Sequence, residues 1–291
     1  MTIKAMIIKT ILLLLTLSVI SSCSQDTYNV NYAGDKLVVN ALIEANIGVT
    51  VALSKSQSPI GNIPNDGYDI KNGRVWLYQN DTLVAEMTLN VKGKYTINNF
   101  KPQAKKSYRL KAVANNLDTA ESLPVVMPDA PIISSFILKQ DSTLRVNQSR
   151  GAILFSFLLK DDISEKNFYF LDSYVQVNRD STDRGRLKGL LPPGYEACEF
   201  YAYSNLVSFT DRCFNGTDFK IDYTSEHNKK GTIVIELSGI DGHFLTYLNS
   251  LEQPGSLELG FSEPKLAVSN IKNGYGIFFA KNTKTFSLKL D

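Results

Sequence analysis

Histidine and cysteine are scarce in this chain, and their scarcity excludes most of the sites that proteins use for chemistry. The 291 residues include only two histidines and three cysteines. Neither His227 nor His243 stands at ligand spacing from a cysteine, so we expect no metal site. A Ser-His-Asp arrangement would have to use one of these two histidines, and for each of them a surface role is the simpler interpretation.

Recognised catalytic motifs are absent as well. The sequence contains no Gly-x-Ser-x-Gly elbow, no His-Glu-x-x-His pair, no P-loop and no Rossmann glycine pattern. Asp161, Asp162 and Glu165 could in principle support glycoside chemistry, which uses paired carboxylates, but solvation in a charged turn is the simpler account. The same turn lacks the spacing of a calcium loop. We therefore expect no enzyme, no catalytic residue and no cofactor, and a surface hydrolase is an alternative that no residue supports.

Neither sign of charge is in excess. The chain has 31 basic and 29 acidic residues, and the first 22 residues contain Lys4, Lys9 and no acidic residue, so residues 23–291 carry 29 of each sign. A nucleic-acid-binding protein would show a basic stripe, so nucleic acid is not an expected partner. Hydrophobic residues make up 43% of the chain, which is enough for packed cores and argues against a disordered protein.

One apolar run, from Ile11 to Ile20, indicates membrane targeting. It follows Lys4 and Lys9 and leads through two serines to Cys23, which is the pattern of a bacterial lipoprotein signal peptide. Cleavage before Cys23 would allow the cysteine to receive a diacylglyceryl group and its new amine to receive a fatty acid such as palmitate. A transmembrane anchor is disfavoured because the run is about half of the roughly 20 residues that a bilayer needs. An ordinary secretory signal is the other alternative, because Ile20 replaces the commoner leucine.

The two remaining cysteines predict a disulfide. With Cys23 lipidated, Cys198 and Cys213 form an even pair close in sequence, as expected outside the cytoplasm. Closing a loop of about 15 residues would stabilise the fold by about 3 kcal/mol in the chain-entropy model. Two free thiols in a β core are the alternative.

Alternating apolar and polar residues predict a mainly β protein with two domains. Residues 1–22 form the predicted signal peptide and 23–35 a lipidated tether. Residues 36–127 read as an immunoglobulin-like or prealbumin-like β-sandwich, with strands at Leu37–Ile43, Val49–Leu53, Arg74–Tyr78, Leu83–Leu89 and Tyr108–Val113. Three prolines between Pro124 and Pro131 mark the boundary with a second β-rich domain, 128–291.

The second domain contains one predicted helix, near 241–252. Asp241 can cap it, and apolar residues recur at three- and four-residue spacing from Phe244 to Leu251. The aromatic stretch Phe200–Phe209 predicts either a partner-facing patch or a strand buried in the core. Its position between the two cysteines of the proposed disulfide, Cys198 and Cys213, does not decide between the two.

Two resemblances follow from particular residues. Gly93-Lys-Tyr95, Phe100-Lys-Pro102 and Tyr108-Arg-Leu110 resemble the prealbumin-like and carboxypeptidase-regulatory-like sandwiches, in which Tyr95, Phe100 and Tyr108 would be core residues. The stretches Gly231–Ser238, His243–Glu252, Phe261–Pro264 and Val268–Phe278 resemble a Bacteroidota outer-membrane lipoprotein family known only as domain of unknown function 4249.

The second resemblance implies a location and a partner but no catalytic residue. The resemblance implies an outer-membrane lipoprotein of the kind commonly encoded beside a TonB-dependent transporter. We therefore expect an outer-membrane lipoprotein that faces the cell exterior and acts as a non-catalytic accessory subunit of such a transporter in nutrient binding or uptake. The alternative is an autonomous surface glycan- or peptide-binding protein or adhesin, with Phe200–Phe209 as its platform. Asn270, Asn273, Gly274 and Gly276 tolerate positive φ and predict a tight turn.

Overall fold

The computed structural model describes residues 34–58, 68–146, 149–176, 184–186, 189–190, 201–203, 206–226, 231–251 and 267–289. Cys23, the predicted signal peptide and almost all of the tether lie outside these residues. The chain forms two compact units, residues 1–34 with 57–63 and residues 35–56 with 64–291. All the strands of the described part belong to the second unit.

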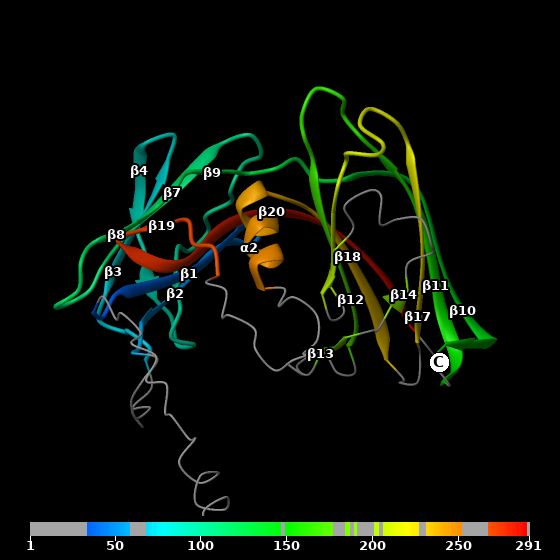
Figure 1. The fold of residues 1–291 in the computed structure, drawn as a ribbon, viewed down its shortest axis with the longest axis horizontal. Coiled ribbons are helices and arrows are strands. Elements are labelled where there is room, and N and C mark those ends of the chain that lie inside the picture. The colour runs from blue at the N-terminus through cyan, green and yellow to red at the C-terminus, as the bar shows by residue number, and fades with distance from the viewer. Residues whose placement is uncertain are drawn as a thin grey trace, which may run out of the picture. The chain divides into compact units, whose positions relative to one another are not determined.

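The second unit confirms the mainly β fold: in its described part, three sheets accompany one short helix, α2 (Gly242–Leu251) (Figure 1). The ten-stranded sheet has the order β15 (Tyr201–Tyr203), β16 (Leu206–Thr210), β12 (Phe168–Gln176), β18 (Thr232–Ile240), β20 (Gly274–Lys289), β1 (Leu37–Glu44), β2 (Gly48–Lys55), β6 (Tyr95–Thr96) and β5 (Thr88–Leu89), with β13 (Arg184–Arg186) paired to β12. The six-stranded sheet has the order β19 (Ile271–Lys272), β8 (Ala120–Ser122), β7 (Ser107–Val113), β3 (Arg74–Gln79) and β4 (Thr82–Glu86), with β9 (Val125–Val126) paired to β7. The four-stranded sheet has the order β10 (Ile132–Val146), β11 (Ser149–Lys160), β17 (Phe219–Glu226) and β14 (Gly189–Leu190).

The first hydrophobic core lies between the six-stranded sheet and the β1–β2 part of the ten-stranded sheet. Every second residue of β1 and β7 is buried in it, as the alternation in the sequence predicts. Tyr95 and Tyr108 are 2% and 1% exposed, which confirms them as core residues, and Phe100 packs against them from a partly buried position. The Tyr95 hydroxyl accepts a hydrogen bond from the Gly73 amide (2.9 Å), so its polar end is satisfied inside the core.

The second hydrophobic core lies between the four-stranded sheet and the β12–β16–β18 part of the ten-stranded sheet. Its centre consists of aromatic and β-branched side chains, among them Phe155, Phe157 and Phe209. Phe209 is fully buried, so this end of the aromatic stretch 200–209 forms core and not a partner-facing platform. Phe200 itself lies outside the described residues.

The 16-residue strand β20 belongs to both cores. Its first half pairs in parallel with β1, from Gly274 beside Leu37 to Lys281 beside Glu44, and from Lys281 onward it pairs antiparallel with β18 (Figure 1). The sequence predicts two separate strands here, at residues 277–280 and 286–290, because the segment between them is polar. The domain division at residue 127 stays a prediction, and β20 continues one sheet across it.

Polar partners explain why β20 does not break at its centre. Lys281 forms an ion pair with Glu44 (3.0 Å), and both side chains are at most 18% exposed. Thr283 donates to the same carboxylate (2.9 Å) and is 2.9 Å from the Ser238 hydroxyl. Since these polar side chains satisfy one another on neighbouring strands, the run can remain in the sheet.

The predicted strand 83–89 is in fact two strands in two different sheets. β4 ends at Glu86 in the six-stranded sheet, and β5 begins at Thr88 in the ten-stranded sheet. Met87, which is 4% exposed, lies between them, and its amide donates to the Val75 carbonyl (2.8 Å). The chain therefore crosses from one sheet to the other at a buried side chain, a step that alternation alone does not reveal.

The segment from Asn270 to Gly276, which leads into β20 and includes its first residues, has a structural role that only part of its glycine and asparagine content predicts. Asn273 (φ 55°) and Gly276 (φ 106°) have the positive φ expected of a tight turn. Asn270 instead is 4% exposed, and its side-chain amide accepts from the Phe278 amide (2.9 Å) and donates to the Phe278 carbonyl (2.7 Å). Gly274 is required by close packing, because a Cβ there would lie 2.5 Å from the Leu37 carbonyl oxygen.

The helix α2 confirms the prediction at 241–252. Asp241 caps it as predicted, with Oδ1 accepting from the His243 amide (2.8 Å). The second carboxylate oxygen accepts from the Ala280 amide, which ties the start of the helix to β20. Phe244 stacks on Phe279, with ring centroids 3.9 Å apart, so the apolar face of the helix packs against the ten-stranded sheet. No helix in the described part of the chain is long and apolar enough to cross a bilayer.

Candidate functional site

A cleft of about 870 Å³ lies within the second unit, in the size range of ligand sites, which is roughly 300–1,000 Å³. Segments distant in the sequence form it: the proline-rich connection that leads into β10, the turn between β11 and β12, and the junction of β18 with α2. Its lining combines prolines and aliphatic residues with charged and amide side chains. No single stretch of sequence predicts this combination.

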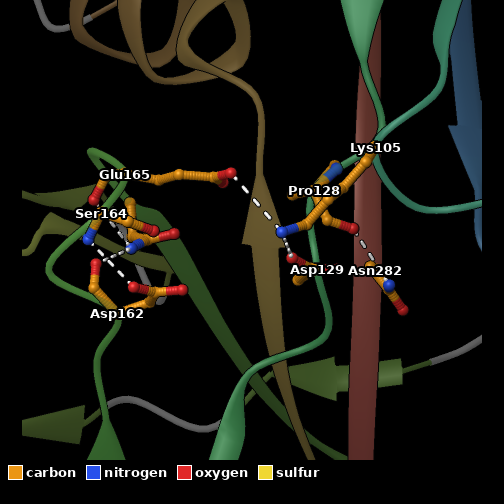
Figure 2. A network of polar contacts seen from close by, with 8 residues as sticks. Lys105, Pro128, Asp129, Asp162, Ser164, Glu165 and Asn282 are labelled. Atoms are coloured by element: carbon orange, nitrogen blue, oxygen red, sulfur yellow. Dashed lines mark hydrogen bonds and ion pairs between the residues drawn. The ribbon is translucent and has the colours of Figure 1, made fainter.

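The proline-rich wall is held in place through its backbone. The Met127 amide donates to the Lys106 carbonyl (3.0 Å), and the Met127 carbonyl accepts from the Lys105 amide (2.8 Å). The next carbonyl, that of Pro128, accepts from the Asn282 side chain on β20 (3.1 Å) (Figure 2). This wall is therefore formed before any ligand arrives.

Lys105 links two walls of the cleft. Its ammonium lies 3.2 Å from the Asp129 carboxylate and 3.5 Å from that of Glu165, and Figure 2 shows it between the two. The hydrogen bond to Asp129, with the added field of Glu165, raises the pKa of Lys105. The proline-rich wall and the turn after β11 thus share one cation.

The carboxylates of the turn after β11 hold the fold together. Asp161 accepts hydrogen bonds from the Tyr169 hydroxyl (2.8 Å) through one oxygen and from the Gly216 amide (2.9 Å) through the other. Asp211 accepts from the Asn167 amide, and its burial raises its pKa above the ordinary value. These contacts tie the turn 161–167 to the turn that follows β16.

Asp162 also has a local partner. Its Oδ1 accepts from the Ser164 amide (2.9 Å), and this bond lowers the pKa of Asp162 (Figure 2). Asp161, Asp162 and Glu165, the carboxylates that could in principle support glycoside chemistry, are therefore each engaged by a neighbouring group. The arrangement explains them as parts of a turn and of its link to Lys105.

The helical wall presents polar residues to the cleft. His243, Thr246 and Asn249 line it at three-residue spacing along α2. The side-chain oxygen of Asn249 is buried and has no hydrogen-bond partner among the residues that the structure describes. Behind this face, burial raises the pKa of Asp241, although the amides that it binds favour its charged form.

Four side chains singled out in the sequence line the cleft, namely Asp162, Glu165, Asp241 and His243, together with many that sequence reasoning missed. Cys23, Cys198 and His227 lie outside the described residues. Cys213 lies in the turn between β16 and β17. Because Cys198 is not among the described residues, the predicted disulfide between the two stays a prediction. Within the described ranges, no group of three histidine, cysteine or acidic side chains is placed to hold a metal ion. The chemistry that the cleft offers is hydrogen bonding, apolar contact and, through its lysines and carboxylates, ion pairing.

Comparison with known proteins gives one decisive match. The family model described as a domain of unknown function, DUF4249, matches residues 25–287. The chain belongs to this family. Because the match extends over both cores, the DUF4249 region includes the cleft, the segment that precedes β20 and all but the last two residues of β20. No curated protein matches the chain.

The resemblance to solved structures is much weaker. A β-glucuronidase from glycoside hydrolase family 2 aligns with 88% of this chain at 9% identity and a TM-score of 0.20. The chain spans about a fifth of the length of that protein, since the alignment covers 20% of it. A likeness at this score carries no argument about fold or activity.

Proposed function

We propose that this DUF4249 protein is a lipoprotein of the outer membrane, facing the cell exterior, that acts as a non-catalytic accessory subunit of a TonB-dependent transporter in nutrient binding or uptake. The observation that carries the proposal is the targeting sequence that ends at Cys23. Two or three acyl chains on this residue would make membrane attachment effectively permanent, because each buried CH₂ contributes about 0.8 kcal/mol.

The spacing between the predicted anchor and the first strand supports this arrangement. The 12 residues from Ser24 to Asp35 are polar and unperiodic, and β1 begins at Leu37. Fully extended, such a segment spans about 40 Å, which is enough to hold the folded unit clear of a bilayer. The family resemblance supplies the transporter as the partner.

The contacts around the cleft support a role in binding. The carboxylates of Asp129, Asp162 and Glu165 are engaged by Lys105 or by a neighbouring amide, and Asp241 caps a helix. A general acid or base needs to reach the proton that it transfers, so Asp241, which is buried and bound to backbone amides, is a poor candidate. Asp129 and Glu165 are more than half exposed, and their ion pairs with Lys105 hold them only weakly. A preformed cleft of ligand size is what a binding subunit requires.

The same cleft favours a second candidate function, that of an autonomous surface protein that binds a glycan or peptide. Phe209 is buried and does not contribute to the platform that the sequence suggested, and the side chains of residues 200–206 lie outside the described part of the chain. The cleft supplies a different one. The two functions differ in whether a transporter is present in the complex.

Substitution of Cys23 by alanine tests the anchor. We expect the wild-type protein to remain in washed outer membranes, and to be labelled by a fatty-acid probe, whereas Cys23→Ala is unlabelled and leaves the membrane fraction. Asn115→Ala, in an exposed turn far from the anchor in the sequence, is the control and should be retained and labelled like the wild type. Retention and labelling of Cys23→Ala would contradict the proposal.

A further inference from the structure

The C-terminal half of β20 is an open edge of the ten-stranded sheet. β1 lies beside β20 only as far as Lys281, and among the described strands residues 282–289 pair with β18 alone (Figure 1). In the facing four-stranded sheet β10 is also an edge strand, because its described partner is β11 alone. Phe136 of β10 stacks on Phe286 of β20, with ring centroids 3.9 Å apart. The two edges, residues 135–141 and 282–289, therefore border the same side of the second core, which we call the open side.

The main chain of β20 offers hydrogen-bonding groups to the open side. The Lys281 carbonyl accepts from the Ala45 amide, just after β1 (3.1 Å), whereas the Ala280 carbonyl accepts from the amide that follows β18 (3.1 Å). Successive residues of a strand direct their N–H and C=O groups to opposite neighbours. Beyond Lys281, the odd-numbered residues therefore point these groups away from β18. Thr285 and Ser287 thus present donors and acceptors that no described strand pairs.

Apolar side chains of the core are only partly covered on the open side. Phe136 and Leu138 of β10 and Phe286 and Leu288 of β20 pack against the second core from partly buried positions. Ile137, on the edge strand β10, is 59% exposed. Proteins usually cover or charge an edge of this kind, because an exposed edge pairs readily with another chain. A further strand beside β20 would cover these side chains with every second residue of its own.

Three lysines give the open side a positive charge. Lys139 of β10 and Lys284 and Lys289 of β20 are exposed, and none of them forms an ion pair with a described residue. The carboxylate on these two edges, Asp141, accepts from the amide and the hydroxyl of Thr143 (2.9 and 2.6 Å). Like charges facing each other across a ladder are destabilising, so the lysines disfavour a second copy of this chain and favour an acidic partner.

We propose that the open side binds an extended segment of a partner protein, which adds a strand beside residues 283–289 of β20 and in which apolar residues alternate with acidic ones. The main chain of the partner pairs with Thr285 and Ser287, its apolar residues cover Phe136 and Phe286, and its carboxylates pair with the lysines of the two edges. Strand addition of this kind is a common mode of peptide recognition. The inference goes beyond the proposed function, because it holds whether the partner is a transporter or another protein.

The test uses the full chain, purified in detergent, and three synthetic peptides of about eight residues, a typical strand length. The first alternates valine with glutamate, the second alternates valine with lysine, and the third is the first with two of its valines replaced by proline, which removes ladder hydrogen bonds. Fluorescence anisotropy of the labelled peptide measures binding. Amide hydrogen exchange of the protein identifies the strand that the peptide protects.

Two variants of β20, each with a control, test the contacts. Thr285→Pro removes an N–H from the open edge, where proline is tolerated, and Thr285→Val keeps that N–H in the same exposed position. Lys284→Glu reverses a charge on the open side, and Lys92→Glu makes the same change in an exposed turn far from it in the sequence.

We expect the valine–glutamate peptide to bind and to slow the exchange of the Thr285 and Ser287 amides. Thr285→Pro should weaken binding about tenfold or more, and Lys284→Glu about fivefold, whereas Thr285→Val and Lys92→Glu should bind like the wild type. Equal binding of either other peptide, equal affinity of Thr285→Pro and Thr285→Val, protection of another strand in place of β20, or no binding would overturn the inference. The test contains no transporter, so it succeeds or fails independently of the accessory role.

Discussion

The contact between β1 and β20 should be the most sensitive point of the fold, because it joins the two cores. A Cβ at Gly276 would lie 2.2 Å from the Val39 carbonyl oxygen, and Gly276 has φ 106°. Backbone strain of this kind costs about 1–3 kcal/mol, and overpacking adds about 1–3 kcal/mol. We expect Gly276→Ala to lower the free energy of unfolding by about 4 kcal/mol, a large part of the roughly 5–15 kcal/mol of a typical protein.

Two further glycines separate the causes of this loss. Gly93 (φ 70°) has open space around its Cβ position, with the nearest atom, on the Lys71 side chain, at 3.7 Å, so Gly93→Ala should show the cost of φ alone. Gly274 approaches the Leu37 carbonyl but has no positive φ, so Gly274→Ala should show the cost of contact alone. The Gly276→Ala effect should be close to the sum of the other two.

Urea unfolding followed by tryptophan fluorescence measures all three, with thermal scans as a second readout. A loss of 4 kcal/mol corresponds to a fall in Tm of about 10 °C for a chain of this size, and the loss of about 1 kcal/mol expected for Gly93→Ala to about 3 °C. If Gly276→Ala is no worse than Gly93→Ala, the backbones of β1 and β20 are not in tight contact, and the reasoning is refuted.

Three other outcomes are expected. Asn270→Ala should lower the free energy of unfolding by about 2–4 kcal/mol, because both backbone groups of Phe278 lose a buried partner. Asn115→Ala, at an exposed position, is the control. Equal urea midpoints for the two variants would contradict the role of Asn270. The raised pKa of Asp211 means that the folded state holds the carboxyl proton more tightly than the unfolded state does. The contribution of Asp211 to stability therefore falls as pH rises above 3.8, the ordinary pKa of an aspartate. Asp211→Asn should flatten the profile of urea midpoint against pH in that range, and an unchanged profile would argue against the shift. Mass spectrometry of the unreduced, alkylated protein should find Cys198 and Cys213 joined. Replacing either cysteine by serine should lower the free energy of unfolding by about 3 kcal/mol. Alkylation of both cysteines in the native protein would contradict the disulfide prediction.

Alternation and capping predict much of the fold because they are local. The buried positions of β1 and β7 repeat at every second residue, and α2 has both its cap, Asp241, and its apolar face in one short stretch. Sequence patterns fail where a distant partner decides the outcome. The polar centre of β20 stays in the sheet because Glu44 and Ser238 satisfy it, and Met87 divides a predicted strand because it is buried between two sheets.

The cleft could not be predicted for the same reason. Asp129, Glu165 and Asn249 are more than 30 residues apart in the sequence, and each has an ordinary surface interpretation taken alone. Only the fold shows that Lys105 joins the first two and that the third lacks a partner. The acidic turn at 161–165 shows the reverse: its composition suggests chemistry, and its contacts show a structural role.

Docking on a TonB-dependent transporter is the central claim, and co-purification tests it most directly. The tagged, lipidated protein is isolated from native outer membranes in mild detergent, and its partners are identified and quantified by mass spectrometry. Cys23→Ala, expressed at the same level, is the control for capture after lysis. The account predicts one transporter in stoichiometric amount with the wild type and a strong loss with the variant. Recovery of the wild-type protein alone would contradict the accessory role and leave the autonomous binding function in its place.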